Sequence, residues 1–267
     1  MKRREFLKTS LVASTLAGLG PAGLSASAAG PGSGGKQEYY EWRVYRLQSA
    51  DQYDPLHAYL DKAAIPMLNR LGVKTVGAFT EIDPKDGPAV HTLRAYPNLD
   101  VFAAVNTRGN ADLEFLKVGA EYLTSPKSKP AFERIDCWLM QAFAGMPRLE
   151  LPAYCRERKP RIFEVRTYES HSELKALKKV VMFNEGEIDV MREVGLGPIF
   201  YGQALIGRNL PHLTYMVSAE NQDAHKKHWD AFRVHPTWEK LKNDLQYADT
   251  VSKIENRFLV PTPYSQI

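Results

Sequence analysis

The sequence lacks several features that define common classes of protein. Its 267 residues contain no run of eighteen apolar residues, so we expect no transmembrane helix. The net charge is +4, and +3 of it belongs to the first 28 residues. The remaining +1 disfavours nucleic-acid binding, which needs basic residues clustered on one face. No G-x-G-x-x-G follows a predicted strand, and neither a complete G-x-x-x-x-G-K-[ST] nor a G-x-S-x-G is present. Nucleotide-dependent chemistry and serine hydrolysis are therefore disfavoured.

Cysteine is also scarce, and the two that occur, Cys137 and Cys155, leave their pairing open. They could form a disulfide in an oxidising compartment. However, Cys137 falls in a predicted strand and Cys155 in a predicted linker, and the sequence does not set the Cα separation that a disulfide requires. We favour two free thiols, at least one of them buried.

The N-terminus has the pattern of an export signal. Residues 3–8, RREFLK, resemble the twin-arginine signal, and a mildly apolar run follows at 11–24. The small residues at 26–28 are typical of a cleavage site. We predict a signal peptide at 1–28, a flexible Gly-rich leader at 29–38, and a periplasmic or secreted protein.

What the sequence does contain is an internal repeat. Tyr40-Glu41-Trp42-Arg43-Val44-Tyr45 and Phe163-Glu164-Val165-Arg166-Thr167-Tyr168 share one pattern: aromatic, Glu, any residue, Arg, any residue, Tyr. Further pairs keep nearly the same offset, namely Ile65 with Ile188, Gly72 with Gly195, His91 with His212 and Ile135 with Ile254. An offset that drifts by four residues over a hundred indicates duplication of a whole unit.

Each copy predicts the order β-α-β-β-α-β. The expected strands are 39–47, 74–82, 89–96 and 133–143 in the first copy, and 161–169, 198–206, 212–218 and 252–260 in the second. Gly72 and Gly195 are placed to end helices, and Pro66 predicts a kink or a break. We therefore predict an α+β protein: two ferredoxin-like repeats, packed sheet to sheet, as an intrachain pseudo-dimeric α+β barrel. The expected segments are repeat 1 at 39–143, a linker at 144–160, repeat 2 at 161–261 and a plain tail at 262–267.

The second copy resembles the NIPSNAP family. The resemblance rests on residues 164–168, on His212 at the start of the third strand, and on Trp229, Phe232 and residues 235–238. It covers nearly all of 161–261 and is weaker over 39–143. It implies the dimeric α+β barrel fold, a group that includes small monooxygenases and lactone isomerases. Animal NIPSNAP proteins are associated with mitochondria and with vesicle or mitophagy roles, whereas bacterial members mostly lack an assigned activity.

The Glu-x-Arg-x-Tyr faces admit two interpretations. In the first, they line a cleft between the sheets, where Arg would hold an anionic or carbonyl group and Tyr or Glu would move a proton. The ligand-binding set is then Glu41, Arg43, Tyr45, Glu164, Arg166 and Tyr168, together with Tyr201 and Trp229. In the second, each Glu pairs with an Arg across the pseudo-two-fold axis and locks the halves together. We favour the lock.

The histidines supply the remaining candidates. A catalytic set of Tyr168, His212 and Arg166 is the prediction if there is an enzyme, and the register of His91 and His212 stays open because a slip of one residue reverses the face. His225 and His228 lie three residues apart on a predicted helix, but no strict ligand motif completes a metal site. We predict no metal and no cofactor.

We therefore expect an exported protein that binds a small molecule in the cleft between its repeats. Two alternatives remain: a cofactor-independent enzyme of the monooxygenase or isomerase type, and a structural interaction protein. Assembly into a homo-oligomer is left open, and no nucleic-acid partner is expected.

Overall fold

The computed structural model describes residues 36–267. The predicted signal peptide at 1–28 and most of the predicted leader lie outside the described residues. Within residues 36–267, no helix has the length and apolar character needed to cross a membrane.

The first half of the described chain runs through four strands with helices after the first and third. Its elements are β1 (Tyr39–Arg46), η1 (Ala50–Gln52), α1 (Tyr53–Tyr59), η2 (Leu60–Ala64), α2 (Ile65–Arg70), β2 (Thr75–Glu81), β3 (Ala89–Tyr96), α3 (Leu99–Gly109), α4 (Leu113–Val118), α5 (Ala120–Leu123) and β4 (Arg134–Ala142).

After α6 (Ala153–Arg156), the second half repeats this order. Its elements are β5 (Ile162–Glu169), α7 (Glu173–Met182), η3 (Phe183–Glu187), α8 (Ile188–Glu193), β6 (Gly197–Ile206), β7 (His212–Ala219), α9 (Gln222–Arg233), α10 (Pro236–Lys242), η4 (Leu245–Tyr247) and β8 (Lys253–Pro261). All eight strands lie within a residue or two of their predicted ranges, because alternating apolar residues and Gly or Pro punctuation define short strands well.

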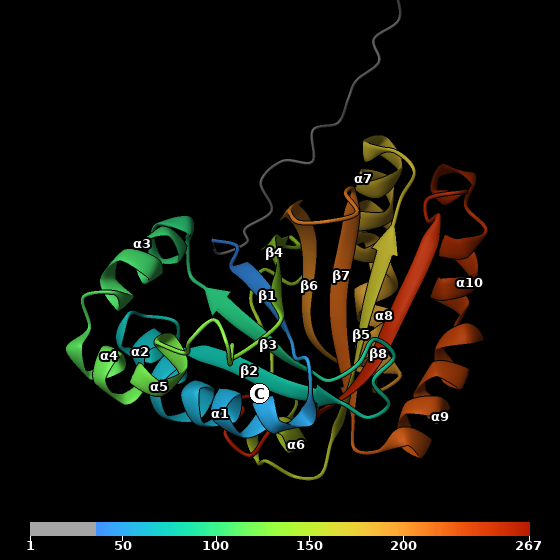
Figure 1. Cartoon of the computed structure of the whole chain (residues 1–267). Helices are drawn as coiled ribbons and strands as arrows, with labels where there is room; N and C mark the ends of the chain where they lie inside the picture. The colour runs from blue at the N-terminus through green and yellow to red at the C-terminus, as the bar shows by residue number, and fades with distance from the viewer. Residues whose placement is uncertain (1–35) are drawn as a thin grey trace, which may run out of the picture. The chain divides into compact units, whose positions relative to one another are not determined.

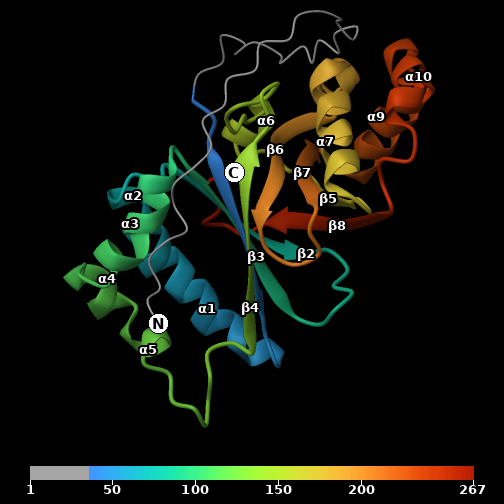
Figure 2. The ribbon, with the colours of Figure 1, turned by 90° about the horizontal axis from the view of Figure 1, so that it is seen from above.

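The strands form one closed antiparallel barrel in the order β1-β3-β2-β8-β5-β7-β6-β4. Two seams join the halves: β2 pairs with β8, and β4 pairs with β6 across a bulge at Leu139 and Met140. Helices α1–α5 lie outside the strands of the first half and α7–α10 outside those of the second (Figures 1 and 2). The predicted α+β class and barrel closure are confirmed.

Both halves interrupt their first helix at the same place. The five-residue π-helical segments η2 and η3 occupy 60–64 and 183–187, an offset of 123. The predicted break near Pro66 is therefore present, with Pro66 in the first turn of α2. Since η3 has no proline, the interruption does not depend on that residue. A π segment instead adds one residue to a turn and rotates the helix face that follows it.

The core has three parts, because most strands place apolar side chains both inside the barrel and against the helices. Inside the barrel pack Tyr40, Trp42, Phe79, Phe163, Val165, Phe200 and their neighbours. A second cluster fills the space between β1–β3 and the first set of helices, and a third does so in the second half. Fully burying one such large side chain contributes about 1.5 to 3 kcal/mol.

Two segments predicted to be peripheral belong to the folded body. In the predicted linker, α6 packs Cys155 against the barrel interior. The predicted plain tail at 262–267 instead runs along β2: the Thr262 and Gln266 backbone N–H groups donate to carbonyls of Ala78 and Val76, each at 2.9 Å, and Ile267 is buried inside the barrel. The expectation of a plain tail is wrong, because β2 pairs with β8 over only three residues and leaves backbone groups for it.

Candidate functional site

One end of the barrel interior is not filled by side chains. A pocket of about 260 Å³ opens there, close to the lower end of the size range of small-molecule sites. Its apolar floor is formed by Trp42, Val44, Ala89, Trp138, Met140 and Val165. Its polar residues are Arg46, Glu81, Asp86, Asp136, Thr167, Glu169, Arg208, Asn209, His212, Thr214, Glu255 and Arg257, together with His91.

Strand alternation explains this composition. Trp42, Val44 and Arg46 point to the same side of β1, and Val165, Thr167 and Glu169 do so on β5. Along both strands the interior side changes from apolar to polar as the chain approaches the pocket end. The other end is packed with aromatic rings, among them Phe79 and Phe163 at 5.1 Å between centroids. The pocket therefore has an apolar floor and a polar rim.

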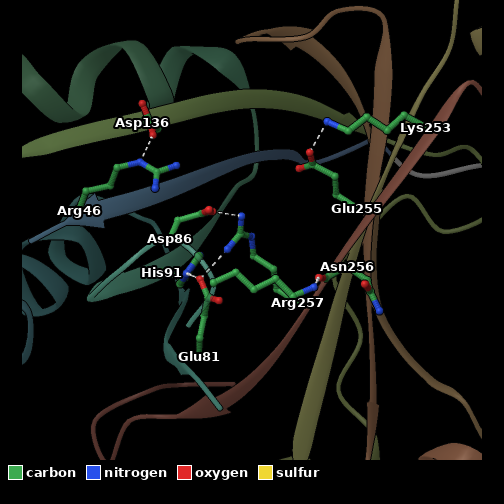
Figure 3. A network of polar contacts seen from close by, with 10 residues as sticks. Arg46, Glu81, Asp86, His91, Asp136, Lys253, Glu255, Asn256 and Arg257 are labelled. Carbon is green, nitrogen blue, oxygen red and sulfur yellow. Dashed lines mark hydrogen bonds and ion pairs between the residues drawn. The ribbon is translucent and has the colours of Figure 1, made fainter. Parts of the chain in front are cut away.

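Hydrogen bonds with Glu81, which also binds Arg257, hold His91 in the pocket wall (Figure 3). His91 Nε2 lies 2.9 Å from Glu81 Oε1, and Arg257 Nη1 donates to the same oxygen at 2.9 Å. Arg257 also donates to Asp86. Burial would raise the pKa of Glu81, but His91 and Arg257 together hold it below its ordinary value. Burial lowers the pKa of His91, against the opposing effect of Glu81. At neutral pH we therefore take Glu81 as ionised and His91 as neutral.

His212 lies across the barrel from His91. The strands that carry them, β7 and β3, are four places apart in a ring of eight. His212 is 3 % exposed, and burial lowers its pKa. Its Nδ1 is 3.4 Å from Thr214 Oγ1, whereas its Nε2 has no hydrogen-bond partner among the described residues. Both histidines therefore occupy the pocket wall, which settles the register that the sequence left open.

A second network lies at the other seam. Arg46 Nε donates to Asp136 Oδ2 at 2.6 Å, and Arg208 Nη2 is 2.9 Å from Asp136 Oδ1. Asp136 belongs to the first half and Arg208 to the second, just as Glu81 and Arg257 do at the opposite seam. Charged pairs therefore cross both seams beside the pocket.

The Glu-x-Arg-x-Tyr faces point away from this pocket, toward the helices. Tyr45 packs with Leu56 and Leu60 of the first helices, and Tyr168 packs with Phe183 and Trp229. The prediction that these faces line the space between the sheets is wrong in orientation. The aromatic and branched residues of β1 and β5 occupy the barrel interior instead, because the charged face finds its hydrogen-bond partners within the sheet in the first half and from both sheet and helix α9 in the second.

In the second half, four side chains surround the buried carboxylate of Glu164. Arg166 donates to it at 2.7 Å, Asn256 at 3.0 Å and the Trp229 indole at 2.9 Å, and His225 Nε2 lies 2.9 Å away. Burial alone would raise the pKa of Glu164, but His225, Arg166 and Asn256 lower it to about 2.

In the first half, Glu41 is surrounded by residues of the sheet itself. Arg43 lies at 2.5 Å, Arg94 at 3.2 Å and the Tyr96 hydroxyl at 2.6 Å. Burial opposes ionisation, but the two arginines and Tyr96 lower the pKa of Glu41 to about 2. The predicted pairing of Glu with Arg occurs, but within each half. The predicted lock across the pseudo-two-fold axis is wrong for these residues.

One family model matches the second half of the chain. Residues 163–266 match the NIPSNAP family model. The C-terminal half is NIPSNAP-like. The resemblance inferred from residues 164–168, His212 and the Trp229 helix is confirmed over this segment. No curated protein matches the chain.

Solved structures match the barrel over most of the chain. A candidate monooxygenase from Fusobacterium nucleatum covers 85 % of this chain and 93 % of its own, at 11 % identity and a TM-score of 0.54. A second, from Lactobacillus acidophilus, covers 85 % and 94 %, at 9 % identity and a TM-score of 0.53. At such identities these matches support the dimeric α+β barrel type of fold and nothing further.

The predicted catalytic set does not converge. Arg166 Nε donates to the Tyr168 hydroxyl at 3.3 Å, but both lie on the helix side of β5, whereas His212 is in the pocket. Tyr168 instead lies 2.9 Å from the Tyr215 hydroxyl, and the predicted ligand residue Tyr201 is fully buried beside Met191. Ligand binding by the predicted set stays a prediction, and in this arrangement it would require access beneath the helices.

Sequence reasoning missed the polar residues of the pocket, namely Arg46, Glu81, Asp136, Glu169, Arg208 and Arg257. For the two on the opening strands a signal was present, because Trp42 and Val44 in one copy, and Phe163 and Val165 in the other, form the more apolar face of each strand. Such a face suits a closed interior. Extending the alternation to the strand ends would have led to Arg46 and Glu169.

The histidines of α9 lie against residues of the second half. His225 contacts Glu164 and Trp229, while His228 lies against Gly195. Within residues 36–267, no group of three or more His, Cys, Asp or Glu side chains is arranged to hold a metal ion. Both cysteines are free, and Cys137 Sγ lies 3.2 Å from Glu41 Oε1.

Proposed function

We propose that this protein binds a small molecule in the pocket inside the barrel. The observation that carries the proposal is the pocket itself, an unfilled space of about 260 Å³ with tryptophan on its floor and two opposed histidines in its wall. Protein interiors are normally close-packed, so an unfilled space with convergent polar groups favours a binding site.

Tryptophan fluorescence tests this proposal. Of the four tryptophans, Trp42 and Trp138 line the pocket, whereas Trp229 and Trp238 lie among the helices of the second half. A ligand in the pocket should quench emission from the first pair only. Trp42→Phe together with Trp138→Phe should abolish the response, and Trp229→Phe should retain it. Mass spectrometry of small molecules released from the purified protein would identify a natural occupant. Quenching that survives the double substitution would place binding elsewhere.

A second candidate function is catalysis without a cofactor, by an enzyme of the monooxygenase or isomerase type. The Glu81–His91 pair favours it, because a buried carboxylate that orients an imidazole is a common arrangement for a general base. The two candidate monooxygenases that share the fold give the same suggestion by analogy alone. Conversion of a bound ligand by the wild type but not by His91→Gln, with binding retained in both, would establish it.

We also propose that the chain is exported through residues 1–28 and that its halves are duplicated ferredoxin-like repeats. The paired arginines at positions 3 and 4 support export. A reporter fused to residues 1–35 should leave the cytoplasm, and Arg3→Lys with Arg4→Lys should stop it. The repeated element order and the two π segments at one offset support duplication.

A further inference from the structure

One edge of the pocket carries more arginine than carboxylate. The Asp136 side chain is 3 % exposed and lies between two guanidinium groups: Arg46 Nε donates to Oδ2 at 2.6 Å, and Arg208 Nη2 is 2.9 Å from Oδ1. Among residues 36–267, Asp136 is the only carboxylate that forms an ion pair with either guanidinium. This edge therefore keeps one positive charge without a partner.

The two guanidinium groups are accessible from the pocket. The side chains of Arg46 and Arg208 are 31 % and 63 % exposed, and both line it. Arg46 makes a single hydrogen bond with the described residues, through Nε, and its two terminal nitrogens are turned away from Asp136 (Figure 3). Guanidinium groups bind carboxylates through paired N–H donors, more strongly than neutral donors do. A ligand anion in the pocket can therefore use these donors.

The apolar floor of the pocket leads to these arginines. Trp42, Val44 and Arg46 follow one another on the pocket side of β1, and Trp138 and Asp136 do so on β4. In the antiparallel pairing Trp42 lies opposite Trp138, and Val44 lies opposite Asp136. Along both strands the lining therefore changes from aromatic to charged, which suits a flat apolar molecule with one polar end.

The other side of the rim, on β2, β8 and β5, has the opposite charge balance. There each cation is shared by two carboxylates: Arg257 by Glu81 and Asp86, and Lys253 by Glu169 and Glu255. An anionic group is therefore favoured at the Asp136 edge and disfavoured across from it.

We propose that the pocket takes an aromatic monocarboxylate, with its carboxylate on Arg46 and Arg208 and its ring against Trp42 and Trp138. The inference rests on the proposed binding function and adds the chemical class of the ligand. One carboxylate restores the charge balance of this edge. Asp136 is then a positioning residue, because it holds both guanidinium groups without touching the ligand.

The test compares two probes of nearly the same shape, 2-naphthoate and 2-naphthamide, by calorimetry with the full protein. One charge-assisted contact corresponds to a preference of about tenfold for the naphthoate. Arg208→Ala and Arg46→Gln should each bring this preference close to one, because Asp136 then balances the remaining arginine. Arg233→Ala is the matched control, since it removes an equally exposed arginine from α9, outside the pocket, and it should keep the wild-type preference.

Asp136→Asn tests the charge balance in the opposite direction. The amide keeps the shape of the side chain but removes its negative charge, so two positive charges face the ligand. The preference for naphthoate should rise by about threefold above that of the wild type. Arginines with a purely structural role would give no such increase, so an unchanged or lower preference would contradict the proposal.

The outcomes separate this inference from the proposed function. Equal affinity of the wild type for both probes would overturn the carboxylate preference and leave small-molecule binding intact. A preference that persists in both Arg208→Ala and Arg46→Gln would also overturn it, because the anion would then bind elsewhere. Binding of neither probe would overturn an aromatic carboxylate as the occupant, whereas the tryptophan response to a released molecule would still decide the proposed function. If Asp136→Asn does not fold, the exposed Arg208→Ala decides.

Discussion

The two halves stabilise equivalent buried glutamates in different ways. Glu41 is neutralised by two arginines of its own sheet, whereas Glu164 is held by one arginine and by His225 and Trp229 of helix α9. The first half therefore completes its polar network before any helix docks on it. In the second half, the network is complete only when α9 is in place. A shared strand pattern thus leads to two different couplings between sheet and helices.

The halves differ again beneath their first helix. In the second half, Lys179 and Glu187 form a buried ion pair at 2.7 Å, and the ammonium lies over the Phe183 ring. The equivalent positions in the first half, at the offset of 123, are Leu56 and Ala64, both buried. One fold therefore accommodates either an ion pair or an apolar contact at the same place.

Removing each glutamate would test the first contrast and should produce the largest effects. Glu41→Ala leaves Arg43 and the 5 % exposed Arg94 without their carboxylate, whereas Glu164→Ala leaves one guanidinium unpaired. We expect losses of about 5 and about 3 kcal/mol in the free energy of unfolding, measured in urea. Equal losses would mean that the number of arginines left without a carboxylate does not decide the loss in the free energy of unfolding.

Copying the first half into the second would test the other contrast. Lys179→Leu alone leaves Glu187 buried and unpaired and should cost about 3 kcal/mol. Lys179→Leu with Glu187→Ala reproduces Leu56 and Ala64. The double change should lower the free energy of unfolding by only about 1 kcal/mol, because no buried charge is left without a partner. Chemical denaturation of both variants measures the difference. A double variant less stable than the single one would show that the ion pair is itself stabilising.

Acid should weaken both halves through their glutamates. Each has a folded pKa of about 2, below its ordinary value of 4.5, so the unfolded chain binds more protons in this range. The stabilisation is complete above about pH 4.5 and is lost as the pH falls toward 2. We expect Glu164→Gln to flatten the dependence of the unfolding free energy on pH by about 3 kcal/mol over this window. An unchanged slope would contradict the lowered pKa.

The seams should show the smallest effects. Arg257 pairs with the nearly buried Glu81, whereas Arg208 is 63 % exposed and shares Asp136 with Arg46. Arg257→Ala should cost about 1 kcal/mol, and Arg208→Ala should stay within about 0.5 kcal/mol. Thermal unfolding of the two variants gives the comparison. A larger loss for Arg208→Ala would identify the β4–β6 seam as the stronger one.

Much of this architecture could be predicted from local pattern. The repeated strand motif, Gly72 and Gly195 at helix ends, and the near-constant offset were sufficient to predict eight strands and a closed barrel. The positive φ of both glycines, +96° and +86°, is what a helix-ending glycine needs. The resemblance to NIPSNAP rested on residues 164–168, on His212 and on the Trp229 helix, and it was confirmed over 163–266.

The orientation of the strands could not be predicted in the same way. Alternation shows that Glu164, Arg166 and Tyr168 share a face, but a charged face and an apolar face can exchange sides if the helices provide donors. His225 and Trp229 provide them sixty residues later. The C-terminal residues likewise look polar and irregular, although Ile267 enters the barrel.

The sequence by itself determined the strands, their pairing into two similar units and the sets of side chains that share a face, because these depend on period and on neighbouring residues. Only the tertiary structure decided which face encloses the pocket and which residues meet at its rim. Glu81 with Arg257, and Asp136 with Arg208, come from distant segments that join only when the barrel closes. Contacts of that kind depend on how the whole chain packs, and a local sequence pattern does not specify how distant segments pack together.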